Sequence, residues 1–266
     1  MKSTSMKSYL TSLTALGFAA ALCLFAGATQ AAEWGTLTGR FVLDGTVPTP
    51  AKLKADKDPQ VCAKHDLFDE SVVVGKDGGV QNVVIYLNTK NPEIAPSYEA
   101  SKSGKVTVDN SKCRFEPHVA FMRNTQTLEL KNSDPIGHNT KADPIKNPGF
   151  NVLLAASGEP VDQKFAQEES IPVKIGCNIH PWMGAYVVVR SNPYGAVSGA
   201  DGKFEIKDLP AGKELEFRLW QETPGYLKNV KVGTAAADTK GLFKLKIKPG
   251  SNDVGDIKVP AKLLTK

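Results

Sequence analysis

IPVKIGCNIHPWMGAYVVV, at residues 171–189, contains a short loop sequence between two apolar runs. Every second residue from Ile171 to Cys177 falls on one face, which is typical of a half-buried strand and directs Cys177 inward at its end. Pro181 interrupts regular strand pairing, and apolar residues resume at Ala185. The stretch therefore predicts two core strands joined by a tight loop, which is a rigid platform for the side chains of that loop.

The loop offers three metal-binding side chains within seven residues: the Cys177 thiolate, the His180 imidazole and the Met183 thioether. These are the soft and borderline ligands that suit copper. A fourth ligand must come from elsewhere, and His138 is the best candidate, because it follows a strand-like run in a loop marked by Pro135. Two histidines, one cysteine and a weak axial methionine form the trigonal arrangement of electron-transfer copper sites. A free buried cysteine with an incidental histidine and methionine is the alternative interpretation.

The chain after residue 33 consists of short runs with period-two alternation, which mark half-buried strands. Clusters of Gly, Pro, Asn and Asp, such as residues 77–79 and 249–250, separate these runs. Many short strands with turn residues between them predict an all-β fold built from sandwiches. The mature chain is expected to divide into an N-terminal β segment at 33–96, a central sandwich at 97–191 and a C-terminal β module at 192–266.

A C-x2-H-x2-M pattern after a strand, with an upstream N-x5-HN pattern, resembles the cupredoxins, the plastocyanin-like blue copper proteins. The spacing is closest to the short ligand loop of amicyanin, and the resemblance spans about residues 104–191. It implies a Greek-key β-sandwich, one copper ion that cycles between Cu(I) and Cu(II), and single-electron transfer outside the cytoplasm. It also implies that Asn139 steadies the ligand loops through hydrogen bonds. The implied ligands are two nitrogens, one thiolate and one axial thioether, from His138, His180, Cys177 and Met183.

The sequence AVSGADGKFEI at 196–206, followed by LPAG at 209–212, resembles the carboxypeptidase regulatory-like, transthyretin-type β fold. Phe204 and Ile206 are expected to pack inward. This resemblance implies a small β-sandwich at the C-terminus with no chemistry of its own.

The N-terminus predicts export. Two lysines precede an uncharged, mostly apolar run at residues 9–27, and small residues follow. That order defines a secretory signal at 1–31, with cleavage after Ala31 or Ala32. An uncleaved membrane anchor is the alternative, because the run approaches spanning length. No later segment of the sequence is apolar enough to span a bilayer. We therefore expect a periplasmic or otherwise exported protein.

The cysteines point to one disulfide. Of four cysteines, one leaves with the signal and three remain. Cysteines of exported proteins tend to pair, so an odd number leaves one with another role. Because Cys177 belongs to the ligand loop, Cys62 and Cys113 are predicted to be bonded to each other. A zinc site that adds His65 and His118 to this pair is the alternative. Outside such a site, His118 is expected to be hydrogen-bonded or exposed.

Charge and the remaining motifs argue against several functions. A formal net charge of +5 is too mild to indicate nucleic-acid binding. Neighbouring carboxylates such as Asp69-Glu70 and Glu168-Glu169 are interpreted as solvated turns. A cysteine and a histidine on one tight loop suit joint metal coordination better than nucleophile activation. An enzyme is not expected, because four protein ligands leave no open coordination position.

The sequence therefore predicts an exported, mononuclear copper protein. It would carry single electrons to or from a redox protein such as a cytochrome or a dehydrogenase, and His180 would pass the electron if its ring edge is exposed. Two other functions remain open: a non-redox β-sandwich scaffold of the cell envelope, and copper sequestration or delivery. Exchangeable metal without fast redox chemistry would favour sequestration or delivery.

Overall fold

A computed structural model describes residues 1–2, 4 and 33–265, and the predicted signal falls almost entirely outside them. The chain from Ala32 to Lys266 forms one compact unit. This unit is nearly all β, which confirms the predicted fold class. No helix within the described residues has the length and apolar character needed to cross a membrane. The helical elements of the described part are the single-turn α1 (Pro59–Cys62) and the 3-10 turns η1 (Pro96–Tyr98) and η2 (Ala261–Leu263).

Two sheets form a β-sandwich in the middle of the chain. One has the strand order β5-β11-β10-β7-β8 and the other β4-β3-β6-β9, and their inward side chains share one core cluster. The strands of the first sheet are β5 (Val119–Arg123), β7 (His138–Ala142), β8 (Phe150–Leu154), β10 (Val173–Gly176) and β11 (Gly184–Arg190). The strands of the second sheet are β3 (Lys105–Ser111), β4 (Arg114–Glu116), β6 (Thr127–Asn132) and β9 (Val161–Lys164).

Alternation along β10 sets the direction of the cysteine that follows it. Val173 and Ile175 are buried and Lys174 between them is exposed, so Cys177, two residues further on, also faces the core. The expected alternation begins later than the sequence suggests, because Ile171 precedes the first paired residue of the strand and is 48% exposed. The thiol is thus positioned by a packed core and not by the loop alone.

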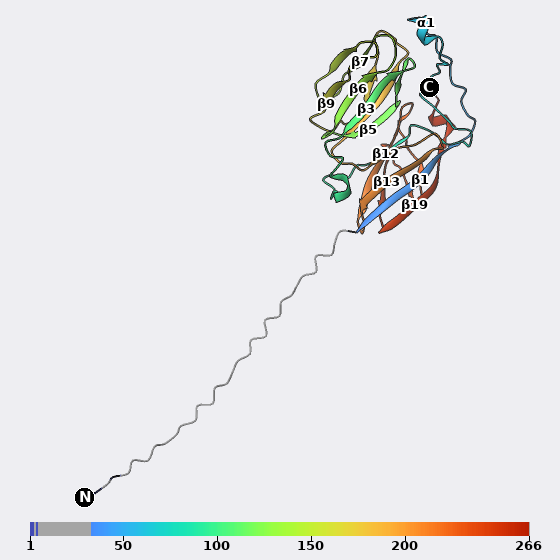
Figure 1. Cartoon of the computed structure of the whole chain (residues 1–266). Coiled ribbons are helices and arrows are strands. Elements are labelled where there is room, and N and C mark those ends of the chain that lie inside the picture. Colours follow the sequence, from blue (N-terminus) through green and yellow to red (C-terminus); the bar gives the residue numbers. More distant parts are fainter. Residues whose placement is uncertain (3, 5–32, 266) are drawn as a thin grey trace. The chain divides into compact units, whose positions relative to one another are not determined.

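A second group of strands lies outside this sandwich. Figure 1 shows β3, β5, β6, β7 and β9 of the sandwich together, and β1, β12, β13 and β19 as a separate group. The second group forms one sheet of order β13-β1-β19, a second of order β12-β2-β14-β15 with β18 on β14, and the hairpin β16-β17. The strands are β1 (Trp34–Asp44), β2 (Val84–Leu87), β12 (Gly195–Val197), β13 (Lys203–Pro210), β14 (Glu214–Gln221), β15 (Gly225–Tyr226), β16 (Lys231–Val232), β17 (Ala235–Ala236), β18 (Leu242–Lys246) and β19 (Gly250–Pro260).

The N-terminal and C-terminal segments share one core. β1 pairs with β13 and β19, and β2 pairs with β12 and β14, so strands from 33–96 complete sheets made by 192–266. Phe41 of β1 lies in the same buried cluster as Phe204 and Ile206 of β13. The inward packing expected for those two residues is confirmed. The likeness of this region to the carboxypeptidase regulatory-like fold stays a prediction.

The long connection between β1 and β2 carries α1 and reaches the central sandwich. A disulfide joins Cys62 of α1 to Cys113, 51 positions further along the chain, with their Cα atoms 5.5 Å apart. The predicted disulfide is confirmed, and the alternative zinc site is excluded because the two sulfur atoms are bonded to each other. Leu67 is buried against both cysteines. The disulfide thereby fastens the connection that carries α1 to the central sandwich, which bears the predicted ligands.

Candidate metal centre

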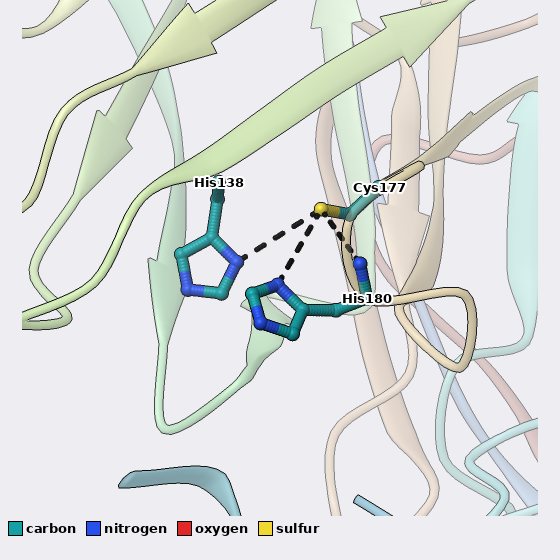
Figure 2. A group of neighbouring side chains, drawn as sticks. All are labelled: His138, Cys177 and His180. Carbon is teal, nitrogen blue, oxygen red and sulfur yellow. Dashed lines mark hydrogen bonds between the residues drawn. The ribbon is translucent and has the colours of Figure 1, made fainter. Parts of the chain in front are cut away.

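Three buried side chains from two separate segments converge on one point. The ligand atoms of His138, Cys177 and His180 all lie within 4.8 Å of one another. The Sγ atom of Cys177 lies 3.9 Å from Nδ1 of His138 and 3.7 Å from Nδ1 of His180. Figure 2 shows the sulfur facing one ring nitrogen of each histidine. The structure thus brings together three of the four side chains that the sequence singles out as ligands.

Backbone hydrogen bonds hold the ligand loop in a tight turn. The N–H of Cys177 donates to the carbonyl oxygen of Met183 at 3.3 Å, and the N–H of Met183 donates to the carbonyl oxygen of His180 at 2.9 Å. The N–H of His180 also donates to Sγ of Cys177 at 3.4 Å. Strands β10 and β11 pair up to Gly176 and Gly184, which fixes both ends of the loop. Met183, the predicted axial ligand, lies on this turn and is 3% exposed.

Asn139 joins the two segments that carry the ligands. Its Oδ1 accepts hydrogen bonds from the backbone N–H groups of Asn178 at 2.8 Å and Ile179 at 3.3 Å. The same oxygen lies 3.4 Å from Sγ of Cys177, and Nδ2 donates to Oδ1 of Asn151 at 2.7 Å. These contacts agree with the role that the cupredoxin resemblance implies for Asn139.

Each histidine of the centre holds a carboxylate with its second ring nitrogen. Nε2 of His138 donates to Oδ2 of Asp134 at 3.0 Å, and Nε2 of His180 donates to Oδ2 of Asp58, also at 3.0 Å. Both rings therefore turn Nδ1 toward the sulfur. Histidines that bind metals usually hold a carboxylate or carbonyl in this way, which fixes their tautomer and their orientation.

Hydrogen bonding in the centre favours the charged forms of its cysteine and of one histidine. Burial lowers the pKa of His138, but its hydrogen bonds to Asp134 and Cys177 outweigh burial and raise that pKa to about 9. Burial raises the pKa of the Cys177 thiol, but hydrogen bonds from His138 and from backbone groups lower it to about 6. At neutral pH the metal-free centre is therefore a thiolate beside an imidazolium, and a metal must displace the proton from His138.

The spacing of the three atoms fits a trigonal metal site. Bonds of about 2.3 Å to sulfur and about 2.05 Å to nitrogen, at an angle of about 120°, place sulfur and nitrogen about 3.8 Å apart. The observed separations from Cys177 Sγ are 3.9 Å and 3.7 Å. One thiolate and two imidazoles form a soft to borderline donor set, which suits copper.

The outer side of the centre is covered. His180 is 0% exposed, and the carboxylate on its Nε2 belongs to Asp58 at the start of α1. The Trp182 ring packs edge-on against His180, with centroids 5.1 Å apart, and its Nε1 donates to the carbonyl oxygen of Cys113 at 3.1 Å. The predicted electron path requires an exposed edge of His180, and this condition is not met, because the segment fastened by the disulfide lies over the ring.

Two supporting carboxylates are absent from the sequence-based candidates. Asp134 lies four residues before His138, in the connection that leads into β7, so the sequence alone could have indicated it as a partner of that histidine. Asp58 lies 122 residues from His180 and belongs to a different segment, so no pattern in the sequence connects the two. The centre thus has one support that is local in the sequence and one that only the folded chain supplies.

A second group of carboxylates corrects the sequence interpretation. Glu169 is 2% exposed, and its carboxylate accepts hydrogen bonds from the backbone N–H groups of Ile145 at 3.0 Å and Lys146 at 2.9 Å. Glu168 pairs with Arg190 at 3.3 Å. The expectation of a solvated turn was wrong here, because backbone donors of a neighbouring loop need an acceptor when they are buried.

Among solved structures, this chain is similar to several copper proteins, but the structural overlap is low in each case. No protein family matches the sequence, and no curated protein matches it. A copper-containing nitrite reductase from Thermus scotoductus SA-01 is 24% identical, with a TM-score of 0.29, over 32% of this chain and 22% of that chain. A purple cupredoxin from Nitrosopumilus maritimus is 21% identical, with a TM-score of 0.27, over 32% of this chain and 98% of that one. An amicyanin variant in its reduced Cu(I) form is 18% identical, with a TM-score of 0.29, over 40% of this chain and 98% of that chain. At these TM-scores the assignment of the centre rests on its own geometry.

Proposed function

We propose that this protein binds one copper ion between His138, Cys177 and His180. The observation that carries the proposal is the convergence of two Nδ1 atoms on one buried thiolate at the spacing of a trigonal site. Met183 lies on the same turn and is proposed as the weak axial ligand. The low pKa of the Cys177 thiol, about 6, supports metal binding because the thiolate is the form that ligates.

Copper bound in such a site supplies a one-electron couple between Cu(I) and Cu(II). The protein's contribution is to keep the ligands still: Asp134 orients His138, Asp58 orients His180, and Asn139 ties the two segments together. All four proposed ligand side chains are buried and come from the protein itself. We therefore propose electron transfer without catalytic turnover, since four protein ligands leave no open position for a substrate.

We propose further that the protein works outside the cytoplasm with a redox protein such as a cytochrome or a dehydrogenase. The Cys62–Cys113 disulfide supports an oxidising compartment, because such bonds persist mainly in exported proteins. Since His180 is covered, the electron would leave through the covering residues Asp58 and Trp182. The C-terminal β module has no chemical role in this proposal.

The covered histidine also favours a second function, the retention of copper for storage or delivery. A metal centre whose outer imidazole is 0% exposed presents no direct ring edge to a redox partner. In that case bound copper would exchange reversibly with a competing chelator, and electron exchange with a small cytochrome would be slow despite a full complement of copper. Measuring both rates on one preparation separates the two functions.

The visible spectrum of the copper-loaded protein tests the proposed site. A trigonal site with two histidines and one thiolate gives intense absorption near about 600 nm from thiolate-to-copper charge transfer. The Cys177→Ser variant is expected to lose the band, while His65→Ala, a histidine outside the centre, is expected to keep it. A colourless complex of the unaltered protein with one bound copper ion would contradict the proposal.

A further inference from the structure

A third histidine, which is largely buried, repeats the arrangement of the two in the centre. His118 immediately precedes β5, and its side chain is 9% exposed. Its Nε2 donates to Oε2 of Glu222 at 2.7 Å. Its Nδ1 is buried and has no hydrogen-bond partner among the described residues. Oε2 of Glu70 faces Nδ1 from 3.8 Å, which is beyond hydrogen-bond distance.

This geometry leaves a ring nitrogen ready to ligate. In the neutral form, His118 carries one ring proton, and the carboxylate of Glu222 would hold that proton on Nε2. Nδ1 of His118 then presents a lone pair toward Glu70. A buried polar atom without a partner costs about 1–3 kcal/mol, so an unoccupied Nδ1 needs a reason. A carboxylate on one nitrogen and an open lone pair on the other is the arrangement of a metal-binding histidine.

An open cleft gives access to these groups. The cleft has a volume of about 560 Å³, and its lining includes Glu70, His118 and Glu222. It extends to Cys177 and Met183, so it runs beside the proposed copper centre. The cleft therefore brings an ion next to the side chains of Glu70 and His118.

We propose that His118 Nδ1 and the Glu70 carboxylate form a second metal site for a borderline divalent cation such as Zn²⁺, with Glu222 as the residue that positions the histidine. Imidazole and carboxylate are ligand types that Zn²⁺ accepts. With two protein ligands, water would fill the remaining positions of this site. The second site differs in chemistry from the copper centre, because its own ligand atoms include no thiolate.

The distance between the two proposed ligand atoms is close to the value that zinc requires. Zinc bonds of about 2.05 Å to nitrogen and about 2.1 Å to oxygen, at a tetrahedral angle, place the two atoms about 3.4 Å apart. The observed separation of His118 Nδ1 and Glu70 Oε2 is 3.8 Å. The Glu70 side chain is 26% exposed, so a small rotation closes the difference.

The surrounding charges leave room for a cation. Two positive side chains, Arg114 and Lys174, line the cleft. Nε of Arg114 lies 2.7 Å from Oε1 of Glu116, and its Nη1 lies 3.7 Å from Oε1 of Glu70, which is not the oxygen that faces His118. Burial raises the pKa of Glu70, and the carboxylates of Glu116 and Glu222 add to the rise, whereas Arg114 and the protonated form of His118 lower it. A bound cation would relieve this crowding of carboxylates.

Zinc and cobalt binding to copper-free protein test the second site. In equilibrium dialysis against Zn²⁺, the unaltered protein is expected to bind two ions and His118→Ala one, while His65→Ala still binds two. Glu222→Gln keeps the ligand atoms but weakens the positioning hydrogen bond, and we expect about 10–100-fold lower affinity for one of the two ions. Glu70→Gln should also remove one ion, and it serves in place of His118→Ala if that variant fails to fold.

Cobalt distinguishes the two sites from each other. Co²⁺ bound to Cys177 gives a thiolate charge-transfer band, whereas Co²⁺ at His118 does not. The band is expected to survive in His118→Ala and to vanish in Cys177→Ala. If the unaltered protein binds a single ion, with the thiolate band, and His118→Ala binds it equally well, the second site does not exist. A single ion without the band that His118→Ala abolishes would support the second site and contradict the copper centre.

Discussion

The two histidines of the proposed copper centre have supporting carboxylates of different origin. Asp134, which holds His138, comes from the connection just before β7, the strand that begins at His138. It is 5% exposed and also accepts hydrogen bonds from the backbone N–H groups of Lys112 and Cys113 at 2.7 Å and 2.8 Å. Asp58, which holds His180, comes from the distant segment at α1. The inner support is therefore part of the sandwich, whereas the outer one is a cover fastened by a disulfide. Ligand geometry and access to the metal should accordingly respond to different substitutions.

The largest expected effect follows from releasing the cover. Replacing Cys62 and Cys113 by Ser removes a cross-link over 51 residues, and the chain-entropy relation predicts a loss of about 4 kcal/mol in the free energy of unfolding. The copper band should persist in the folded protein, because neither cysteine is a ligand, while Cu(I) should pass faster to a chelator. Urea unfolding and chelator competition measure the two effects. Unchanged copper release would show that the segment does not cover the centre.

Removing each carboxylate separately is the next largest effect. Asp134→Ala leaves two backbone donors, of which that of Cys113 is buried, and one buried ring nitrogen without an acceptor. We expect a loss of about 3 kcal/mol in stability and about 10–100-fold in copper affinity. Asp58→Ala should cost less stability, because the Asp58 side chain is 36% exposed. Within the centre it accepts one hydrogen bond, from Nε2 of His180. Denaturant titrations and copper competition on both variants provide the comparison. Equal losses of stability would remove the distinction between inner support and outer cover.

The pH dependence of copper binding tests the charge state of the inner histidine. With the pKa of His138 at about 9 and that of Cys177 at about 6, copper displaces one proton between these values. Affinity should therefore rise about tenfold per pH unit from pH 6 to 9 and level off above pH 9, and below pH 6 a second proton makes the slope steeper.

Copper competition at several pH values measures this profile. In Asp134→Ala the levelling-off should move to lower pH, because the carboxylate that raises the pKa of His138 is gone. His65→Ala, which changes a histidine outside the centre, serves as the matched control and should leave the profile in place. An affinity that does not change between pH 6 and pH 9 would show that His138 is already neutral there.

The smallest expected effect concerns the tryptophan on the cover side. Trp182→Phe keeps an aromatic ring against His180 but loses the hydrogen bond to the carbonyl oxygen of Cys113, which predicts a loss of about 1 kcal/mol in stability. The copper band should be nearly unchanged. A large loss of copper affinity in this variant would mean that Trp182 positions His180 directly, and that the cover and the ligand set are not separable.

The sequence predicts the parts of the centre that depend on local pattern. Alternation before Cys177 and a loop stopped by Pro181 place the thiol and His180 together, because period-two side chains and turn residues act over a few positions. His138 was predicted because the ligand loop supplies three of four expected ligands and a second histidine was needed. Asp134 lies four residues before it. The all-β fold and the disulfide were predictable for similar reasons, from alternation and from an odd cysteine count.

The parts that the sequence does not reveal depend on contacts between distant segments. Nothing near Asp58 indicates that it reaches His180, because the contact is made only when the β1–β2 connection is fastened to the sandwich. The burial of Glu169 has the same origin, since its partners are backbone groups of another loop. Likewise, Glu70 and Glu222 meet at His118 from elements far apart in the chain.

Anomalous diffraction at the copper edge, from crystals of the copper-loaded protein, tests the proposed centre most directly. We expect one strong peak bonded to Nδ1 of His138, Nδ1 of His180 and Sγ of Cys177, with both Nε2 atoms still on their carboxylates. Copper bound elsewhere, or through Nε2 of either ring, would contradict the trigonal site on which the proposed function depends.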